Sequence, residues 1–321
     1  MTDTPTVIST FAGCGGSSQG YKDAGFHELV AVEWDEHACD CLRINFPGVE
    51  VVERDIAEIK GAELLEMGGD LAVGDLDVFD GSPPCQGFST TGRREITDNR
   101  NQLYMQFCRL LGELKPRAFI MENVSGMVMG AMRPTFHDAM KNLTAQGYRV
   151  SCRKLNSWWY GVPQSRDRLI FVGIRNDLPA KPSHPNPERR SPVTTRRALS
   201  GVEVGPYLEL SSRVVEIWDV TKPGQRGNAV SHLIGGKKGS LFNWTKVHPD
   251  KPCPTIATLA TLMHWSERRM LSTNELKRLA SFPDAYEFPG NTRQQWARIG
   301  NSVPPGLMRA VASHVRTLID R

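Results

Sequence analysis

Hydrophobic and polar positions follow two alternating patterns along the first half of the chain. Short apolar runs bounded by glycine, proline or polar residues predict buried strands. These runs cover residues 7–11, 29–32, 76–79, 118–121 and, after a gap, 168–172. Between the runs, apolar residues recur every three or four positions, as from Leu103 to Leu114, until Pro116 stops the helix. Strands that alternate with helices favour a doubly wound, mostly parallel α/β sheet.

Further helices are indicated by residues typical of helix starts and ends. Residues 17–24 predict a helix closed by Gly25, and another is expected to open at Pro134 and end at Gly147. Ser272-Thr273-Asn274-Glu275 is a capping box, which predicts a helix start. The last predicted helix has an apolar stripe formed by Leu307, Val311, Val315 and Leu318.

The regular alternation of strand and helix patterns ends near Leu178. Prolines interrupt any regular pattern at positions 179, 182, 185, 187 and 192. From there to about Pro254 the chain is loop-rich and basic, without a sustained period. We therefore expect a second, smaller domain to begin at residue 179.

Composition narrows the class of protein. The 321 residues are long enough for one large domain and a smaller one. Hydrophobic residues make up 40% and form no long apolar run, so neither a membrane span nor a membrane partner is expected. The N-terminus lacks the regions of a secretory signal. Seven cysteines, an odd count without Cys-x-x-Cys spacing, predict reduced thiols, no metal site and a cytoplasmic location.

Charge is divided unevenly along the chain. Residues 1–80 carry four Lys/Arg against seventeen Asp/Glu, whereas residues 81–321 carry 35 against 18. A basic remainder suits a polyanionic partner, although an ordinary solvated basic surface would have the same composition. Charge alone leaves both interpretations open.

One cysteine stands in an unusual frame. The sequence Gly81-Ser82-Pro83-Pro84-Cys85-Gln86-Gly87-Phe88-Ser89 follows the strand expected at 76–79. The paired prolines stiffen the chain and have no N–H to donate. A thiol fixed in this way at the carboxyl end of a strand is a candidate nucleophile.

Four unusual polar residues, Glu33, Asp55, Cys85 and Glu122, each lie just beyond a predicted strand. In open α/β sheets, ligands bind outside the carboxyl ends of the strands. The four residues are therefore expected to converge on one crevice, although they are far apart in sequence.

A glycine loop, Phe11-Ala12-Gly13-Cys14-Gly15-Gly16, ends the first predicted strand and opens a helix. Ser18 occupies the third glycine position of the dinucleotide fingerprint, and no Gly-Lys-Ser/Thr follows, which excludes a P-loop. Taken alone, this loop is as consistent with a structural turn as with a cofactor-binding loop. Glu33 favours the cofactor loop, because an acidic residue there can bind ribose hydroxyls.

Together these segments resemble the ordered motif series of the DNA cytosine-C5 methyltransferases, from residue 7 to about 315. The matching segments are Phe11–Gly16, Glu33-Trp34-Asp35, Asp55, Pro83-Pro84-Cys85-Gln86, Glu122-Asn123-Val124, Gln164-Ser165-Arg166-Asp167-Arg168 and Gly300-Asn301-Ser302-Val303-Pro304-Pro305. The resemblance implies a Rossmann-like fold that uses S-adenosyl-L-methionine.

The resemblance also implies catalytic roles. Cys85 would add to C6 of a cytosine, and Glu122 would hydrogen-bond its N3 and exocyclic amine. Arg166 and Arg168 would orient the base. Methyl transfer to C5 and loss of the C5 proton would then release Cys85. Because a stacked base cannot reach such a site, it would be flipped out of the duplex.

The implied cofactor contacts come from both ends of the chain. Phe11 and Trp34 would contact adenine, Glu33 the ribose and Asp55 the adenine amine. The remaining implied cofactor residues are Gly13, Gly15, Gly16, Pro83, Asn301 and Ser302. The chain departs from the family at Arg54, where glycine is usual, and in the stretch Ser157-Trp158-Trp159-Tyr160, where the family often has a small residue and an acid.

The resemblance assigns residues 1–178, completed by 292–321, to the catalytic and cofactor-binding domain. Residues 179–291 would form the smaller domain, with target recognition at about 179–253. Between 181 and 250, eleven Lys/Arg stand against six Asp/Glu, which suits phosphate contacts with double-stranded DNA. The residues expected to contact DNA are Gln86, Ser89, Gln164, Lys237 and Lys238.

Two alternatives remain. A tRNA-methylating branch of the family typically has Pro-Phe-Thr after the cysteine motif, where this chain has Gly87-Phe88-Ser89. A catalytically inactive DNA-binding relative would be expected to lose Cys85, Glu122 or the glycine loop. We expect a monomer, associated with the nucleoid through DNA, with a restriction endonuclease as a possible genetic partner. The recognition sequence, and whether the enzyme is solitary or phage-borne, stay open.

Overall fold

The computed structural model describes residues 4–84, 103–187, 191–235, 244–259 and 261–320. The chain forms two compact units. Unit 1 comprises Met1–Asn156, Asp167–Pro187 and Leu307–Arg321, and unit 2 comprises Ser157–Arg166 and Glu188–Gly306.

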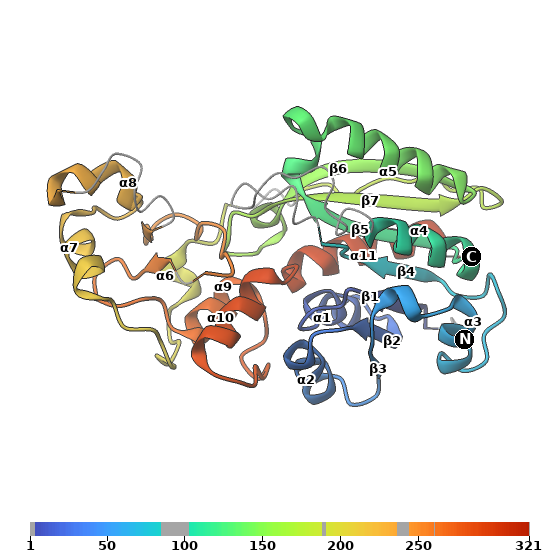
Figure 1. Cartoon of the computed structure of the whole chain (residues 1–321), viewed down its shortest axis with the longest axis horizontal. Helices are drawn as coiled ribbons and strands as arrows, with labels where there is room; N and C mark the ends of the chain where they lie inside the picture. Colours follow the sequence, from blue (N-terminus) through green and yellow to red (C-terminus); the bar gives the residue numbers. More distant parts are fainter. Residues whose placement is uncertain (1–3, 85–102, 188–190, 236–243, 260, 321) are drawn as a thin grey trace. The chain divides into compact units, whose positions relative to one another are not determined.

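Unit 1 is built on a seven-stranded sheet with the order β3-β2-β1-β4-β5-β7-β6 (Figure 1). The strands are β1 (Thr6–Thr10), β2 (His27–Glu33), β3 (Glu50–Glu53), β4 (Val78–Gly81), β5 (Ala118–Val124), β6 (Tyr148–Asn156) and β7 (Asp167–Arg175). Neighbours from β3 to β5 pair in parallel, and β7 runs antiparallel to both β5 and β6. The predicted doubly wound, mostly parallel sheet is confirmed.

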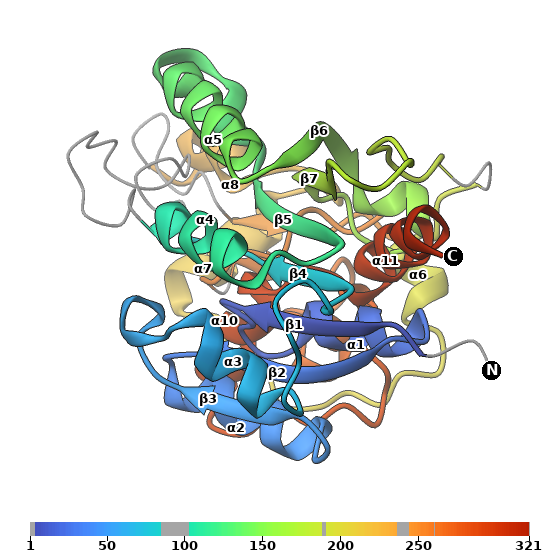
Figure 2. The same cartoon turned by 90° about the vertical axis from the view of Figure 1, so that its right-hand side faces the viewer.

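Helices cover both faces of this sheet. They are α1 (Gly16–Asp23), α2 (Glu36–Asn45), α3 (Gly61–Met67), α4 (Leu103–Leu114), α5 (Arg133–Ala145) and α11 (Pro305–Ile319), with short 3₁₀ turns η1 (Ile56–Glu58), η4 (Ser125–Val128) and η5 (Gly130–Met132). Figure 2 shows α3, α4 and α5 on one side of the sheet, and α1 and α11 on the other.

The main apolar core lies on the α3–α5 side. Phe79 of β4 stacks on Phe107 of α4 with ring centroids 4.7 Å apart, and Phe119 of β5 meets Phe107 edge-on. The stripe predicted from apolar spacing in α4 faces inward, with Leu110, Leu111 and Leu114 fully buried. Burial of this stripe explains why the segment forms a helix across the sheet.

Unit 2 is mostly irregular. Its elements are η6 (Ser157–Tyr160), α6 (Thr195–Ala198), α7 (Ser212–Val220), α8 (Gly227–Val230), η7 (Ser231–Ile234), β8 (Thr245–Lys246), β9 (Leu262–Met263), α9 (Thr273–Leu279) and α10 (Thr292–Asn301). The predicted capping box is present, because Ser272 and Glu275 exchange side-chain and backbone hydrogen bonds at the start of α9.

The two units divide the chain differently from the expected boundary at residue 179. The proline-rich stretch up to Pro187 stays with unit 1, where Ser183 Oγ lies 2.8 Å from His314 Nε2 of α11. Residues 292–306 belong to unit 2, and only Leu307–Arg321 returns to unit 1. Irregular backbone therefore begins before the unit boundary.

Two details of the strands differ from the apolar pattern. Phe11 leaves β1 with a φ of 53° and begins the glycine loop instead of ending the strand. The edge strands β3 and β6 have no long apolar run, since an edge strand is only partly buried. In the described part of the chain, no helix is both long and apolar enough to cross a membrane.

Candidate active site

The strand order reverses between β1 and β4, so the segments that follow these two strands flank the switch point of the sheet. The glycine loop follows β1, and the Pro83-Pro84 frame follows β4. Ligands of open α/β sheets bind at such a point.

The glycine loop is held by hydrogen bonds to β2. Ala12 N–H donates to Val32 O (3.1 Å), and Gly13 N–H donates to Glu33 Oε2 (2.8 Å). Gly13 and Gly15 have φ angles of 55° and 83°, a region that favours glycine. A Cβ built on Gly13 would meet no atom of the described residues within 4 Å, so the loop borders open space in this part of the structure.

Glu33 is the last residue of β2, inside the strand rather than just beyond it as expected. Its Oε1 accepts hydrogen bonds from the N–H groups of Trp34 (2.9 Å) and Asp35 (3.0 Å). With the bond from Gly13, three of about four acceptor positions of the carboxylate are used. No other described residue donates to this carboxylate, so the remaining position can accept from a ligand hydroxyl.

Two further expected cofactor residues follow β2 and β3. The Trp34 side chain is 74% exposed, so its indole face is available to a planar ring. Asp55 caps η1, where its Oδ1 accepts from Ala57 N–H (2.9 Å). Arg54, the departure from the family pattern, pairs with Glu63 of α3.

The end of β4 is tightly packed. Thr10 Oγ1 donates to Asp80 O (3.0 Å), and a Cβ at Gly81 would approach Phe107 to 2.5 Å, so only glycine fits. Asn123 Nδ2 donates to Pro83 O (3.3 Å), which ties the proline frame to β5. Cys85, Gln86 and Ser89 lie outside the described residues.

Glu122 and Arg168 form an ion pair across β5 and β7. The two side chains are 11% and 14% exposed, so the pair is mostly shielded from water. Glu122 lies inside β5, not beyond it, because the strand continues to Val124. These two predicted catalytic residues, 46 positions apart, are thus brought together within unit 1.

Gln164 and Arg166 belong to unit 2 and are buried. Gln164 Oε1 accepts from Ile256 N–H (3.1 Å), and Arg166 Nη1 donates to Ile256 O (2.8 Å). Ser157 closes the same loop, since its hydroxyl donates to Gln164 O (2.6 Å). Both side chains, expected to contact DNA or the base, are bonded to the backbone of their own unit.

The other predicted residues of unit 2 are less informative. Ser302 is buried and its hydroxyl donates to Ile299 O (2.8 Å), whereas Asn301 is exposed at the end of α10. Lys237 and Lys238 lie outside the described residues.

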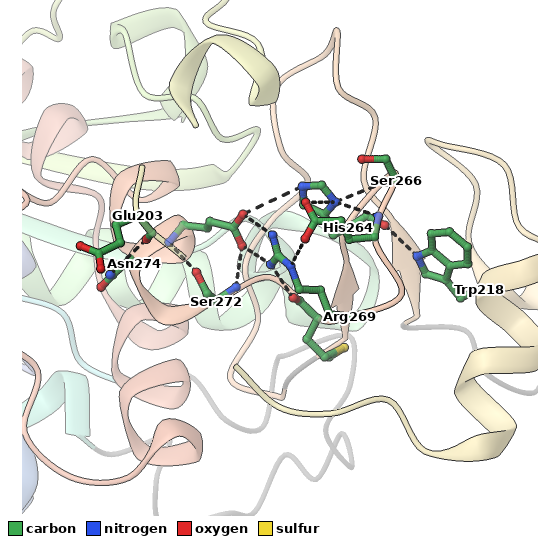
Figure 3. Close-up of polar contacts among 10 residues, drawn as sticks. Glu203, Trp218, His264, Ser266, Arg269, Ser272 and Asn274 are labelled. Atoms are coloured by element: carbon green, nitrogen blue, oxygen red, sulfur yellow. Dashed lines mark hydrogen bonds and ion pairs between the residues drawn. The ribbon is translucent and has the colours of Figure 1, made fainter. Parts of the chain in front are cut away.

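A buried ionic network in unit 2 was not predicted from the sequence (Figure 3). Arg269 Nη1 and Nη2 donate to the two oxygens of Glu275 (2.7 and 2.9 Å), and Arg269 Nε donates to Glu267 (2.7 Å). Glu275 also closes the capping box at Ser272. The capping box marked Glu275 in the sequence, but nothing there indicated its arginine partner.

His264 extends this network toward α7. Its Nδ1 accepts from the N–H groups of Ser266 (3.3 Å) and Glu267 (3.1 Å), and its carbonyl accepts from Trp218 Nε1 (2.8 Å). Burial, followed by the Arg269 charge, lowers the pKa of His264, so the ring is neutral near pH 7. The network therefore joins α7, the turn at 264–269 and α9 of unit 2.

Comparisons with known proteins show the family of the chain. A family model for C-5 cytosine-specific DNA methylases matches residues 5–317. The chain is 32% identical to the Type II methyltransferase M1.HphI of Haemophilus parahaemolyticus, over 97% of this chain and 86% of that protein. It is 33% identical to the Type II methyltransferase M.Sau96I of Staphylococcus aureus, over 95% and 74%.

Solved structures are similar as well. A chain named as a prophage-encoded DNA modification methyltransferase (E. coli) superposes with a TM-score of 0.82 at 26% identity, covering 99% of this chain and 100% of that one. The S. pombe Dnmt2 methyltransferase, with a TM-score of 0.70 at 17% identity over 99% and 100%, shares the fold.

The chain belongs to the C-5 cytosine-specific DNA methylase family. It is a DNA (cytosine-5-)-methyltransferase, similar to proteins named Type II methyltransferases.

Proposed function

We propose that this enzyme transfers a methyl group from S-adenosyl-L-methionine to C5 of a flipped-out cytosine in a specific double-stranded DNA sequence. The observation that carries the proposal is the shielded ion pair between Glu122 and Arg168, because Glu122 lies on β5, next to β4 and the proline frame that precedes Cys85. A carboxylate and a guanidinium in this setting suit a base whose charge changes during reaction.

The chemistry proceeds through a covalent adduct. The Cys85 thiolate adds to C6 of cytosine, while Glu122 holds a proton at N3 and so stabilises the electron-rich ring. C5 then becomes the nucleophile that accepts the methyl group. Loss of the C5 proton to a base expels the Cys85 thiolate and restores the aromatic ring. Arg168 keeps the Glu122 carboxylate oriented throughout.

Unit 1 has residues that fit the cofactor. The open space beside Gly13, the free acceptor position of Glu33 and the exposed Trp34 indole suit a methionine moiety, a ribose and an adenine, respectively. Asp55 and Pro83 complete the proposed site in unit 1, and Asn301 and Ser302 are proposed to contribute from unit 2. When bound, S-adenosyl-L-methionine supplies an electrophilic methyl group.

Recognition is proposed for the basic segment 179–253, which belongs to unit 2 from Glu188 onward and is proposed to contact DNA. Gln86, Ser89, Gln164, Lys237 and Lys238 remain the proposed DNA contacts, and Arg166 the proposed second arginine near the base. Since the relatives are Type II methyltransferases, we also propose that methylation protects DNA from an endonuclease of the same specificity. The enzyme is proposed to act as a monomer.

The test is a methylation assay with the purified protein, labelled cofactor and three substrates: mixed-sequence duplex DNA, the same DNA as single strands, and bulk tRNA. Bisulfite sequencing then maps 5-methylcytosine. We expect methylation of duplex DNA at one short sequence. Methylation of tRNA alone would overturn the proposed substrate, and no methylation of any substrate would support an inactive relative.

A further inference from the structure

Helix α1, which the glycine loop opens, is buried although its sequence is polar. Residues Gly16 to Tyr21 are all buried, and Tyr21 supplies the only large apolar side chain of the helix. With so little apolar surface to bury, hydrophobic packing contributes little to the position of α1. Its hydrogen bonds to the sheet therefore carry more of that task.

Two buried carboxyl groups receive these bonds, one on each side of β1. Tyr21 OH donates to Asp80 Oδ1 of β4 (3.0 Å), and Ser18 Oγ donates to Glu28 Oε1 of β2 (3.1 Å). Asp80 and Glu28 are 1% and 6% exposed. These two contacts join the helix to the strands on both sides of the switch point.

A bulge in β2 turns Glu28 toward α1. Val7 of β1 pairs with Glu28, but the next residue, Ile8, pairs with Val30, so Leu29 is an extra residue in β2. In a regular strand without this bulge, Glu28 and Val30, two positions apart, would share a face, and Val30 packs into the apolar core on the side away from α1. Bulges commonly redirect a side chain in this way.

The two strands bonded to α1 lead to proposed cofactor residues. β2 ends at Glu33, which receives the Gly13 N–H, and β4 leads through Gly81 into Pro83. The helix between them starts at Gly16, directly after the loop. Helix α1 thus links the glycine loop, the end of β2 at Glu33 and the segment from β4 to Pro83. The relative placement of these three segments decides whether a cofactor fits.

We propose that Asp80 and Glu28 are positioning residues, which act through Tyr21 and Ser18 to hold the glycine loop in register with Glu33 and Pro83 for cofactor binding. This inference rests on the proposed function, because it concerns the same cofactor site. Neither carboxyl group contacts the cofactor itself.

The test compares two buried tyrosines of unit 1 in the full chain. Tyr21→Phe removes the bond to Asp80, and the matched control Tyr148→Phe removes the bond from Tyr148 OH to Pro116 O (2.7 Å) on the other face of the sheet. We expect Tyr21→Phe to raise the Kd for S-adenosyl-L-methionine about 3- to 10-fold, the effect of one hydrogen bond. Tyr148→Phe should lower Tm by about as much as Tyr21→Phe does, because each variant loses one hydrogen bond. It should leave the Kd for S-adenosyl-L-methionine unchanged.

A conservative pair of variants separates positioning from general packing. Asp80→Asn keeps an oxygen that can accept from Tyr21 and should bind the cofactor within about 2-fold of wild type. Asp80→Leu keeps the bulk, loses the acceptor and should bind like Tyr21→Phe. Equal Kd values for Tyr21→Phe and wild type, or equal weakening by Tyr148→Phe, would overturn the inference.

A second readout does not require the cofactor. Amide hydrogen exchange at residues 13–20 should be faster in Tyr21→Phe than in Tyr148→Phe, because the helix has lost one of its two bonds to the sheet. If wild type fails to bind S-adenosyl-L-methionine, the proposed cofactor is wrong, while exchange still decides whether Asp80 holds the loop. Unchanged exchange in Tyr21→Phe would contradict the inference.

Discussion

In the part of the chain that the structure describes, Glu122 forms an ion pair with Arg168, and the pair is mostly shielded from water. Glu122→Gln keeps the shape but cannot share a proton with N3 of the base. We expect the methyl-transfer rate to fall about 10²- to 10⁴-fold, as for loss of general acid–base assistance, with unchanged cofactor affinity. Single-turnover kinetics at saturating DNA and calorimetric binding measure the two quantities.

A matched control lies at the other end of β7, where Asp177 pairs with Arg175 at the surface. Asp177→Asn should leave the rate unchanged. Turnover of Glu122→Gln equal to that of wild type would show that Glu122 has a structural role only.

At Arg269, a single side chain satisfies two carboxylates inside unit 2. Arg269→Leu leaves Glu275 buried without its partner, which we expect to cost about 3–5 kcal/mol of folding free energy. Arg196→Leu, which breaks an exposed pair with Asp250, should cost about 0–1 kcal/mol. Urea unfolding followed by circular dichroism compares the two variants, and equal midpoints would contradict the account.

Among the elements, those with a buried apolar face were predictable from sequence. The runs at 29–32 and 118–121 became the central strands β2 and β5, and the stripe of α4 faces the core. The edge strands β3 and β6 were not predictable, because partial burial leaves no apolar run. α1 was expected as a helix, but its burial depends on tertiary hydrogen bonds that no local pattern reveals.

The candidate site also has a part that could be predicted from the sequence and a part that could not. Motifs at strand ends marked the glycine loop, Glu33 and Glu122 because the chemistry there requires particular residue types. The pairing of Tyr21 with Asp80, or of Arg269 with Glu275, has no such signal. Each of these contacts requires knowledge of which elements are neighbours, and of a bulge in the case of Glu28.

The bulge in β2 makes folding stability depend on pH. Burial raises the pKa of Glu28 from 4.5 to about 7, although the Ser9 and Ser18 hydroxyls oppose the shift. The nearby acidic groups Asp80 and Tyr21 are buried as well, and burial raises their pKa values. A raised pKa means that stability is complete below about pH 4.5 and is lost as the pH rises through about 7.

Glu28→Gln cannot ionise and escapes this loss. The free energy of unfolding of the variant relative to wild type should therefore rise between pH 5 and pH 8, by on the order of 3 kcal/mol. Glu66→Gln, on the exposed side of α3, should show no such trend. A difference for Glu28→Gln that stays flat over this range would show that Glu28 does not titrate near pH 7.

For the whole molecule, the uneven distribution of charge along the chain suggests that cofactor binding and target recognition are carried by different segments. The acidic first 80 residues include most of the proposed cofactor residues, and the basic segment 179–253 lies between two blocks of methyltransferase motifs. Exchanging this segment for that of a relative with a different target should move methylation to the relative's sequence. Bisulfite mapping of DNA treated with the chimera shows the outcome, and an active chimera with the original specificity would place recognition elsewhere.

The most direct test of the central claim is covalent trapping of Cys85 on DNA with 5-fluorocytosine at the mapped target. Because fluorine cannot leave C5 as a proton does, the enzyme–DNA adduct should persist after methyl transfer. We predict a complex that survives denaturing electrophoresis, requires S-adenosyl-L-methionine and contains Cys85 as the modified residue by mass spectrometry. An enzyme that methylates ordinary DNA but forms no such complex, or a fully active Cys85→Ser variant, would contradict the account.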